Sequence, residues 1–113
     1  MNRDAYVILT RDGMRNSKAA VKNCAQSLKI LSDETRLRIL REIKDGEKTV
    51  SDINKNLKID QSLLSHHLKI LKEAKLVTCV RQGKYFLYKA SSPVTKTKNS
   101  ESIDLGCCTL NFN

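Results

Sequence analysis

The fold of this chain is decided by the stretch QSLLSHHLKIL, residues 61–71. Leu64, Leu68 and Leu71 recur in it at spacings of four and three, which is typical of one buried face of an α-helix. The other face carries polar and basic side chains, namely Ser62, Ser65, His66 and Lys69. We therefore expect a helix from residue 61 to about residue 75 that is buried on one side and polar on the other.

A second, shorter helix is predicted just before it. Thr49-Val50-Ser51-Asp52 has the Thr-x-x-acid form of a capping box, in which the first side chain accepts a backbone hydrogen bond from the fourth residue. Ile53 and Leu57 follow at helical spacing. After a turn at residues 58–60, Asp60 is placed to cap the longer helix. Two short helices joined by a tight turn indicate a helix-turn-helix.

After residue 76 the apolar period changes to two, as in a β-strand. Residues 77–81 and 84–88 flank Gln82-Gly83, which predicts a hairpin with Gly at its tip. Residues 61–90 hold six Lys or Arg against one Glu, whereas residues 91–113 are neutral. The predicted helix and hairpin therefore carry the basic surface of the chain.

Two further helices are predicted on the N-terminal side. The first covers residues 17–31 and carries a narrow apolar stripe, typical of a seam between helices. Ser32 is expected to cap the second, and Gly46 to end it. The stripe consists of Val21, Cys24, Leu28 and Leu31, and the inward face of the second helix of Leu37, Leu40 and Ile43.

These elements predict a mainly α protein with a small β-hairpin wing, a winged helix-turn-helix, in one domain. We expect residues 1–15 to be weakly ordered, with a short strand at residues 5–9. Residues 16–92 form the DNA-binding and dimerisation domain. Residues 93–113 are a linker, polar and aperiodic at 95–102, followed by a Cys-containing segment whose residues 103–112 could form a final strand.

Composition agrees with a nucleic-acid partner. The 113 residues include 21 Lys and Arg against 12 Asp and Glu, a net charge of +9 that favours a polyanion. No apolar run reaches the length of a membrane span, and the N-terminus lacks a signal-peptide pattern. We therefore expect a cytoplasmic protein whose four Cys are thiols or ligands rather than structural disulfides.

The motifs together resemble the ArsR/SmtB family of dimeric repressors, which release DNA when an inducer binds. The resemblance covers roughly residues 20–90 and rests on SDETRLRIL (32–40), the stretch at 61–71, AKLV (74–77) and RQGK (81–84) in this order. It implies a homodimer that reads an inverted repeat in double-stranded DNA, with no membrane partner. The DNA-contact residues that it implies are Gln61, Ser62, Ser65, His66 and Lys69 in the helix, with Arg81 and Lys84 in the wing.

The inducer site is less obvious, because two sites common in the family are missing. Thr49-Val50-Ser51 stands where a Cys-x-Cys would be needed, and no His follows Lys89. Thiolates select soft metals and metalloids, so Cys107 and Cys108 are the candidate sensing residues for arsenite or another thiophilic ion. Cys24 is the candidate third donor, because the resemblance implies that the first helix packs near the C-terminus at the dimer interface. In a strand, Cys107 and Cys108 would point to opposite faces, but Gly106 leaves a bend possible.

Several alternatives stay open. The inducer could be an oxidant or reactive sulfur, or the cysteines could be purely structural with no metal site. An enzyme is disfavoured because the chain has no C-x-x-C and no Gly-rich phosphate loop, and the basic surface disfavours a purely protein-binding winged helix. Structural roles are expected for Cys79 in its strand, for a half-buried His67 and for Tyr85 and Tyr88 in the hairpin. Arg36 and Arg38 are expected to be surface or interdomain charges rather than base readers.

Overall fold

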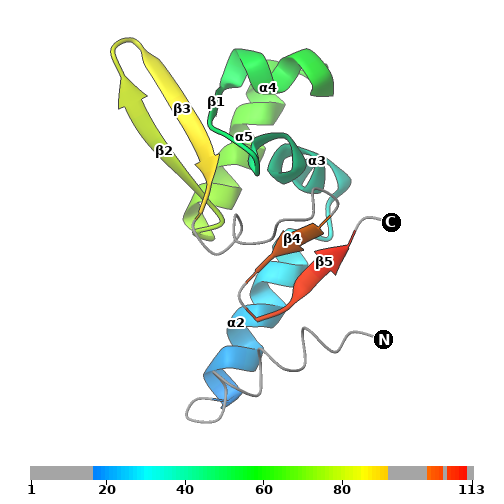
Figure 1. Cartoon of the computed structure of the whole chain (residues 1–113). Coiled ribbons are helices and arrows are strands. Elements are labelled where there is room, and N and C mark those ends of the chain that lie inside the picture. The colour runs from blue at the N-terminus through cyan, green and yellow to red at the C-terminus, as the bar shows by residue number, and fades with distance from the viewer. Residues whose placement is uncertain (1–16, 92–101, 106, 112–113) are drawn as a thin grey trace.

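The computed structural model describes residues 17–91, 102–105 and 107–111 (Figure 1). A body of three helices carries a long hairpin on one side, and a further helix projects from it with a small second hairpin alongside. None of the described helices is long and apolar enough to cross a membrane. The elements in chain order are α2 (Ser17–Ile30), α3 (Glu34–Ile43), β1 (Lys48–Thr49), α4 (Val50–Leu57), α5 (Gln61–Glu73), β2 (Val77–Gln82), β3 (Tyr85–Ala90), β4 (Ser102–Asp104) and β5 (Thr109–Asn111).

The core lies between α3, α4 and α5 and is aliphatic. The apolar faces predicted for these helices are the ones that the structure buries, although Leu37 is only partly buried at the edge of the core. Burying each such side chain contributes roughly 1.5–3 kcal/mol. The most deeply buried side chains are Ile39, Leu40, Ile43, Ile53, Leu64, Leu68, Leu71, Val77 and Ile103.

Side-chain caps begin each of these three helices. Thr49 accepts the backbone N–H of Asp52 at the start of α4, and Asp60 accepts those of Ser62 and Leu63 at the start of α5, as predicted. The prediction for α3 is wrong by one residue, because Asp33 is the cap and accepts the N–H of Arg36. The Ser32 hydroxyl instead donates to the Lys29 carbonyl at the end of α2.

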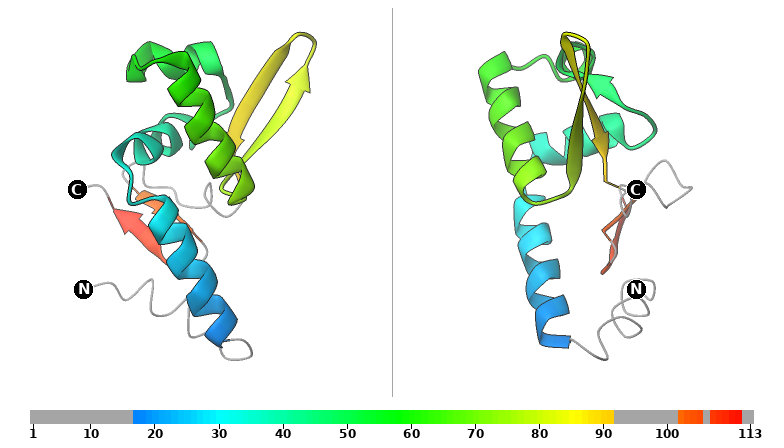
Figure 2. Two further views of the ribbon diagram at one scale, coloured as in Figure 1. Left: turned by 180° about the vertical axis from the view of Figure 1, so that it is seen from behind. Right: turned by 90° about the vertical axis from the view of Figure 1, so that its left-hand side faces the viewer.

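The hairpin is confirmed, and it belongs to a three-stranded antiparallel sheet in the order β1-β3-β2. Gly83 at its tip has a φ of 64°, a left-handed conformation that glycine adopts without strain. β1 pairs Lys48 with Tyr88 and Thr49 with Leu87, and a two-residue strand is too short to show a period in the sequence. The β2–β3 wing extends away from the core (Figure 2).

The C-terminal segment forms a hairpin, so the expectation of one final strand over 103–112 is wrong. β4 pairs with β5 in antiparallel register, with Ile103 opposite Leu110. The Leu105 N–H donates to the Cys108 carbonyl at 2.8 Å and closes the reversal. Ile103 is fully buried, and this anchors the hairpin to the body. The expectations for residues 1–15 and 93–101 lie outside the described residues.

Candidate nucleic-acid interface and thiol cluster

The outward face of α5 is polar and accessible. All five of its predicted DNA contacts are exposed, while Leu64, His67, Leu68 and Leu71 are buried on the inner face. Leu63 is 44% exposed on the same outer side. The structure therefore presents a helix of the size that enters a major groove, with hydroxyl, amide, imidazole and ammonium groups available to base edges and phosphates. The five contacts are Gln61, Ser62, Ser65, His66 and Lys69.

The start of α5 is tied down by Asp60. Its carboxylate accepts the Ser62 hydroxyl as well as the two capping N–H groups. The hydrogen bond from the Ser62 hydroxyl and that from the Leu63 backbone lower the pKa of Asp60. Because the Ser62 hydroxyl hydrogen is directed to Asp60, the oxygen of Ser62 is left to accept a bond from a base.

The wing carries its cations beside aromatic rings. The Arg81 guanidinium lies 5.8 Å from the ring centre of Phe86, and the Lys84 ammonium lies 5.8 Å from that of Tyr85. Both cations are exposed. Tyr85 is 57% exposed, so the expectation that it packs in the hairpin is wrong; this part of the wing extends past the core. Tyr88, closer to the core, does pack against it.

The wing tip and the start of α5 lie at the same end of the molecule, opposite the free end of α2 (Figure 2). A polyanion that approaches this end meets the polar face of α5 and the wing cations together. Both kinds of group are needed at one end, because phosphate contacts position a protein on DNA and base contacts read the sequence.

The three predicted sensing cysteines come together at the other end of the molecule. Cys24 on α2 forms a disulfide with Cys107, which lies between β4 and β5. The Cys108 Sγ is 3.8 Å from that of Cys24 and 3.9 Å from that of Cys107. The three sulfur atoms lie within 4.8 Å of one another, a group that could hold a metal ion.

Two expectations about these cysteines change. Cys107 and Cys108 lie in the reversal of a hairpin rather than in a strand, so the argument that strand geometry separates them does not apply. The expectation that the cysteines are not disulfide-bonded is wrong for Cys24 and Cys107, because the hairpin brings Cys107 against α2. Burial, with a smaller effect of the Asp104 carboxylate, raises the pKa of the Cys108 thiol. This thiol is therefore protonated at neutral pH.

Cys79 lies apart from this cluster. It is half-buried on β2, directly opposite Tyr88 on β3. Burial first, and Cys79 next, raise the pKa of the Tyr88 phenol. This position agrees with the packing role expected for Cys79.

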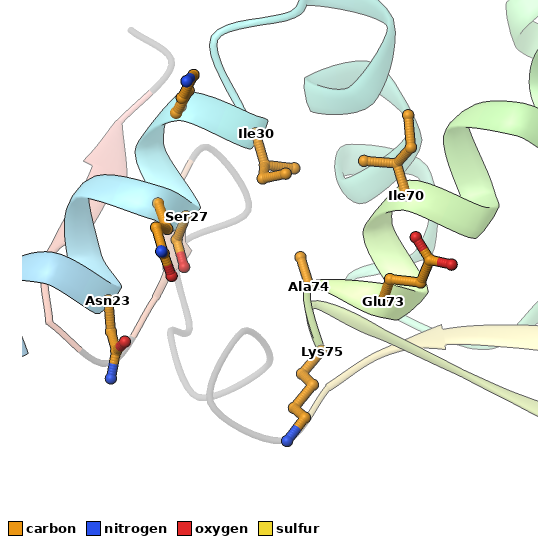
Figure 3. A pocket seen from close by; sticks show the side chains of 9 residues that line it. Asn23, Ser27, Ile30, Ile70, Glu73, Ala74 and Lys75 are labelled. Carbon is orange, nitrogen blue, oxygen red and sulfur yellow. The ribbon is translucent and has the colours of Figure 1, made fainter.

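A groove of about 710 Å³ separates α2 from the C-terminal half of α5 (Figure 3). Asn23, Ser27 and Ile30 line it from α2. Ile70 and Glu73 on α5, with Ala74 and Lys75 after it, line the other side. The two helices are therefore not packed together along this length.

Arg36, which was expected to be a surface or interdomain charge, joins α3 to α5 and to the end of α2. Its Nε donates to the Nδ1 of His67 at 3.1 Å, and its Nη1 donates to the Ile30 carbonyl at 2.9 Å. His67 is 7% exposed, so the expectation of a satisfied histidine is confirmed, though it is more buried than expected. A histidine on an apolar helix face needs a partner, but the sequence does not say which residue supplies it.

Comparisons with known proteins identify the family. A family profile described as "Bacterial regulatory protein, arsR family" matches residues 33–78. The "Arsenical resistance operon repressor" of Staphylococcus xylosus is 32% identical over 96 residues, covering 80% of this chain and 92% of that protein. This chain belongs to the arsR family. The "Transcriptional repressor SdpR" of Bacillus subtilis (strain 168) is also similar, 38% identical over 66 residues, covering 58% of this chain and 73% of that protein.

Solved structures of arsR-type proteins share the fold. "Reduced HlyU from Vibrio cholerae N16961" superposes with a TM-score of 0.66 at 29% identity, covering 74% of this chain and 87% of that chain. A "homodimeric winged helix-turn-helix DNA-binding domain" from Mycobacterium bovis gives 0.61 at 27% identity, covering 68% and 71%. The similarity to these structures confirms the predicted winged helix-turn-helix fold. The arsR family consists of transcriptional regulators, which agrees with the expectation of no enzymatic activity. The matched residues 33–78 contain none of Cys24, Cys107 and Cys108.

Proposed function

We propose that this arsR-family protein is a cytoplasmic transcriptional repressor that binds an inverted-repeat operator in double-stranded DNA as a homodimer. The observation that carries the proposal is the exposed polar face of α5 at the same end of the molecule as the wing cations Arg81 and Lys84. Two relatives that are named as repressors, in Bacillus subtilis and Staphylococcus xylosus, support the direction of regulation.

The exposed stripe on α2 supports the dimer. Val21 is 52% and Leu28 is 40% exposed, and they lie two helical turns apart on one side of the helix. Leu31, at the end of the same stripe, is buried in the core. Packing α2 against its symmetry mate covers the exposed part and places the two copies of α5 for successive major grooves.

Cys24, Cys107 and Cys108 form the proposed inducer site. Arsenite and other soft ions favour several thiolate ligands, and the three sulfur atoms lie within reach of one such ion. The site accepts an ion only after two electrons and two protons convert the disulfide to two thiols, since the oxidised form keeps a single thiol at Cys108. The disulfide itself favours a second candidate, in which oxidation or reactive sulfur is the signal.

A titration on DNA from the protein's own promoter tests the proposal. The reduced protein should bind a fluorescent promoter duplex, with an affinity that falls steeply as salt rises because phosphate contacts release counterions. Arsenite, cadmium, a persulfide and peroxide are then added in turn. We expect at least one of them to weaken binding by roughly 5–150-fold, the usual range for coupling between two sites.

The double variant Cys107→Ser/Cys108→Ser identifies the site. It should bind the promoter as the wild type does and lose the response to the effective inducer. Cys79→Ser is the matched control, because its sulfur is outside the cluster and the response should persist. An undiminished response in the double variant would contradict the thiol site, and absence of promoter binding at low salt would contradict the repressor function.

A further inference from the structure

Arg36 forms a bridge between the helix that carries Cys24 and the helix that faces DNA. Its guanidinium donates through Nη1 to the last carbonyl of α2, that of Ile30, and through Nε to the Nδ1 of His67 on α5. Farther along α2, the groove of about 710 Å³ lies between the same two helices. The bridge therefore lies at the end of α2 where the chain enters the body, whereas the rest of α2 stands away from α5 (Figure 3).

The bridge needs one particular form of His67. Arg36 has only donors, so the Nδ1 of His67 accepts and its proton must lie on Nε2. A protonated imidazole could not accept, and it would place a second positive charge beside Arg36. Burial, the largest effect, lowers the pKa of His67 and keeps the ring neutral; the Asp33 carboxylate acts in the opposite direction, while Arg36 and His66 lower the pKa further.

The position of His67 on the inner face of α5 links the orientation of this helix to the rest of the body. His66, Ser65 and Lys69 on the same helix face outward, whereas His67 faces the body and is 7% exposed. A change in how α5 rotates or tilts about its contact with Arg36 moves all of its outward side chains together. Base readout depends on such placement, whereas attraction to phosphates depends mainly on charge.

We propose that Arg36 and His67 are positioning residues for DNA recognition, which hold α5 in the orientation that reads bases and link that orientation to the end of α2. This rests on the proposed function as a DNA-binding regulator. Neither side chain touches DNA in this role. Loss of the bridge should therefore reduce preference for the operator more than it reduces binding to unrelated DNA.

Nitrogen-15 NMR of the imidazole rings tests the bridge without DNA or inducer. The wild type should show His67 as the neutral form with its proton on Nε2 at about pH 7, and exposed His66 serves as the internal comparison. A His67 ring with its proton on Nδ1, or one that is doubly protonated at that pH, would overturn the proposal.

Substitution then tests the positioning role. His67→Asn keeps an acceptor near the Nδ1 position and does not titrate, while His67→Leu fills the space without an acceptor. The readout is the ratio of affinities for promoter DNA and for an unrelated duplex of the same length. We expect His67→Leu to lower this ratio roughly tenfold, as loss of a hydrogen bond to a charged group predicts, and His67→Asn to retain most of it.

A pH profile separates positioning from simple support of the fold. As pH falls below 6.5 and through the lowered pKa of His67, the ratio should fall more for the wild type than for His67→Asn, which has no ring to protonate at this position. His66 is present in both proteins and so cancels from this comparison. A ratio that falls equally in both proteins would overturn the role of His67.

Two arginine variants complete the experiment. Arg36→Lys has one ammonium and cannot reproduce both bonds, so the ratio should drop. Arg38→Lys is the matched control, because exposed Arg38 donates to the Asn56 carbonyl and not to His67, and its ratio should not change. Urea unfolding checks that each variant is folded.

Two outcomes would contradict different proposals. A folded His67→Leu protein with an unchanged ratio contradicts the role of the bridge alone. A wild type that does not prefer its promoter contradicts the proposed function, and the role of the bridge with it.

Discussion

Two regions of the molecule are stabilised in different ways. Residues 31–90, here called the winged body, bury a continuous aliphatic cluster beneath α3, α4 and α5. The described residues 17–30, 102–105 and 107–111, here called the cysteine arm, combine one helix and one short hairpin that are joined by the Cys24–Cys107 disulfide. Ile103 of the arm is fully buried in the same apolar cluster and anchors the β4–β5 hairpin to the body.

Because of this difference, the stability of the arm should depend on redox conditions, and that of the winged body should not. Apolar packing in the winged body does not change with redox conditions, whereas a reductant breaks the disulfide that joins the parts of the arm. The family profile matches residues 33–78, entirely inside the winged body. The winged body and the cysteine arm are thus held together by different interactions, and reduction of the disulfide should open the arm without removing the apolar core of the body.

Truncating the body core should have the largest effect. Leu68 is 1% exposed on the inner face of α5. Leu68→Ala should lower the free energy of unfolding by about 2–5 kcal/mol, because it removes buried methyl groups and leaves a cavity. Urea unfolding of the reduced and of the oxidised protein measures this loss, which should be the same in both.

Leu63→Ala is the control for that experiment. Leu63 is on the same helix but 44% exposed, so its truncation should change the free energy of unfolding by less than about 0.5 kcal/mol. A loss for Leu68→Ala that differs between the reduced and the oxidised protein would show that the body core depends on the disulfide, contrary to the comparison.

Breaking the disulfide should have the next largest effect, and it should begin in the arm. The disulfide closes a loop with a sequence separation of 83 residues, for which chain entropy gives a stabilisation of up to about 4 kcal/mol. Cys107→Ser, or a reductant added to the wild type, should speed hydrogen exchange in β4 and β5 and along α2, while α5 keeps its protection.

Cys79→Ala provides the comparison, since Cys79 is outside the cluster and its loss should leave the effect of reductant intact. Hydrogen exchange read by mass spectrometry reports both regions in one sample. Equal exchange of α2 and β5 with and without reductant would show that apolar contacts, rather than the disulfide, hold the arm.

The winged body was largely predictable from the sequence for a physical reason. Its leucines and isoleucines repeat at helical spacing, its caps at Thr49 and Asp60 are local, and Gly83 marks the turn of the wing. Each of these patterns depends on residues that lie close together in the chain. The misses in this region were the two-residue β1, the burial of Ile39, the exposure of Tyr85 and the shift of one cap from Ser32 to Asp33.

The arm and the bridge were harder to predict because they depend on distant residues. Cys24 was selected as a third donor by family resemblance, but its bond to Cys107 joins segments far apart in the chain. Arg36 on α3 contacts His67 on α5 and the Ile30 carbonyl at the end of α2, and nothing in the local patterns pairs these residues. Contacts between residues far apart in the chain produce no periodic pattern in the sequence, so they could not be predicted from it.

The smallest effect should come from a polar contact within the winged body. The Glu42 carboxylate on α3 accepts Lys48 Nζ of β1 at 3.0 Å and Asn56 Nδ2 of α4 at 2.9 Å. Burial alone would raise the pKa of Glu42, but these hydrogen bonds and the nearby cations outweigh it, so the pKa lies below its ordinary value of 4.5. The stabilisation is complete well above pH 4.5 and is lost as pH falls through the lower pKa of the folded state.

Glu42→Gln should remove this acid-dependent stabilisation, with a change in the free energy of unfolding below about 1 kcal/mol because the ion pair is partly exposed. Urea unfolding from about pH 7 to about pH 3 measures it, and Glu73→Gln is the control, since Glu73 is exposed at the end of α5. Acid should weaken the winged body through Glu42 while the disulfide stays intact, and reductant should open the arm while Glu42 keeps its contacts. If the free energy of unfolding of Glu42→Gln falls with acid as much as that of the wild type, the Glu42 contacts do not stabilise the packing of α3 against β1 and α4. The apolar core would then account for the stability of the winged body.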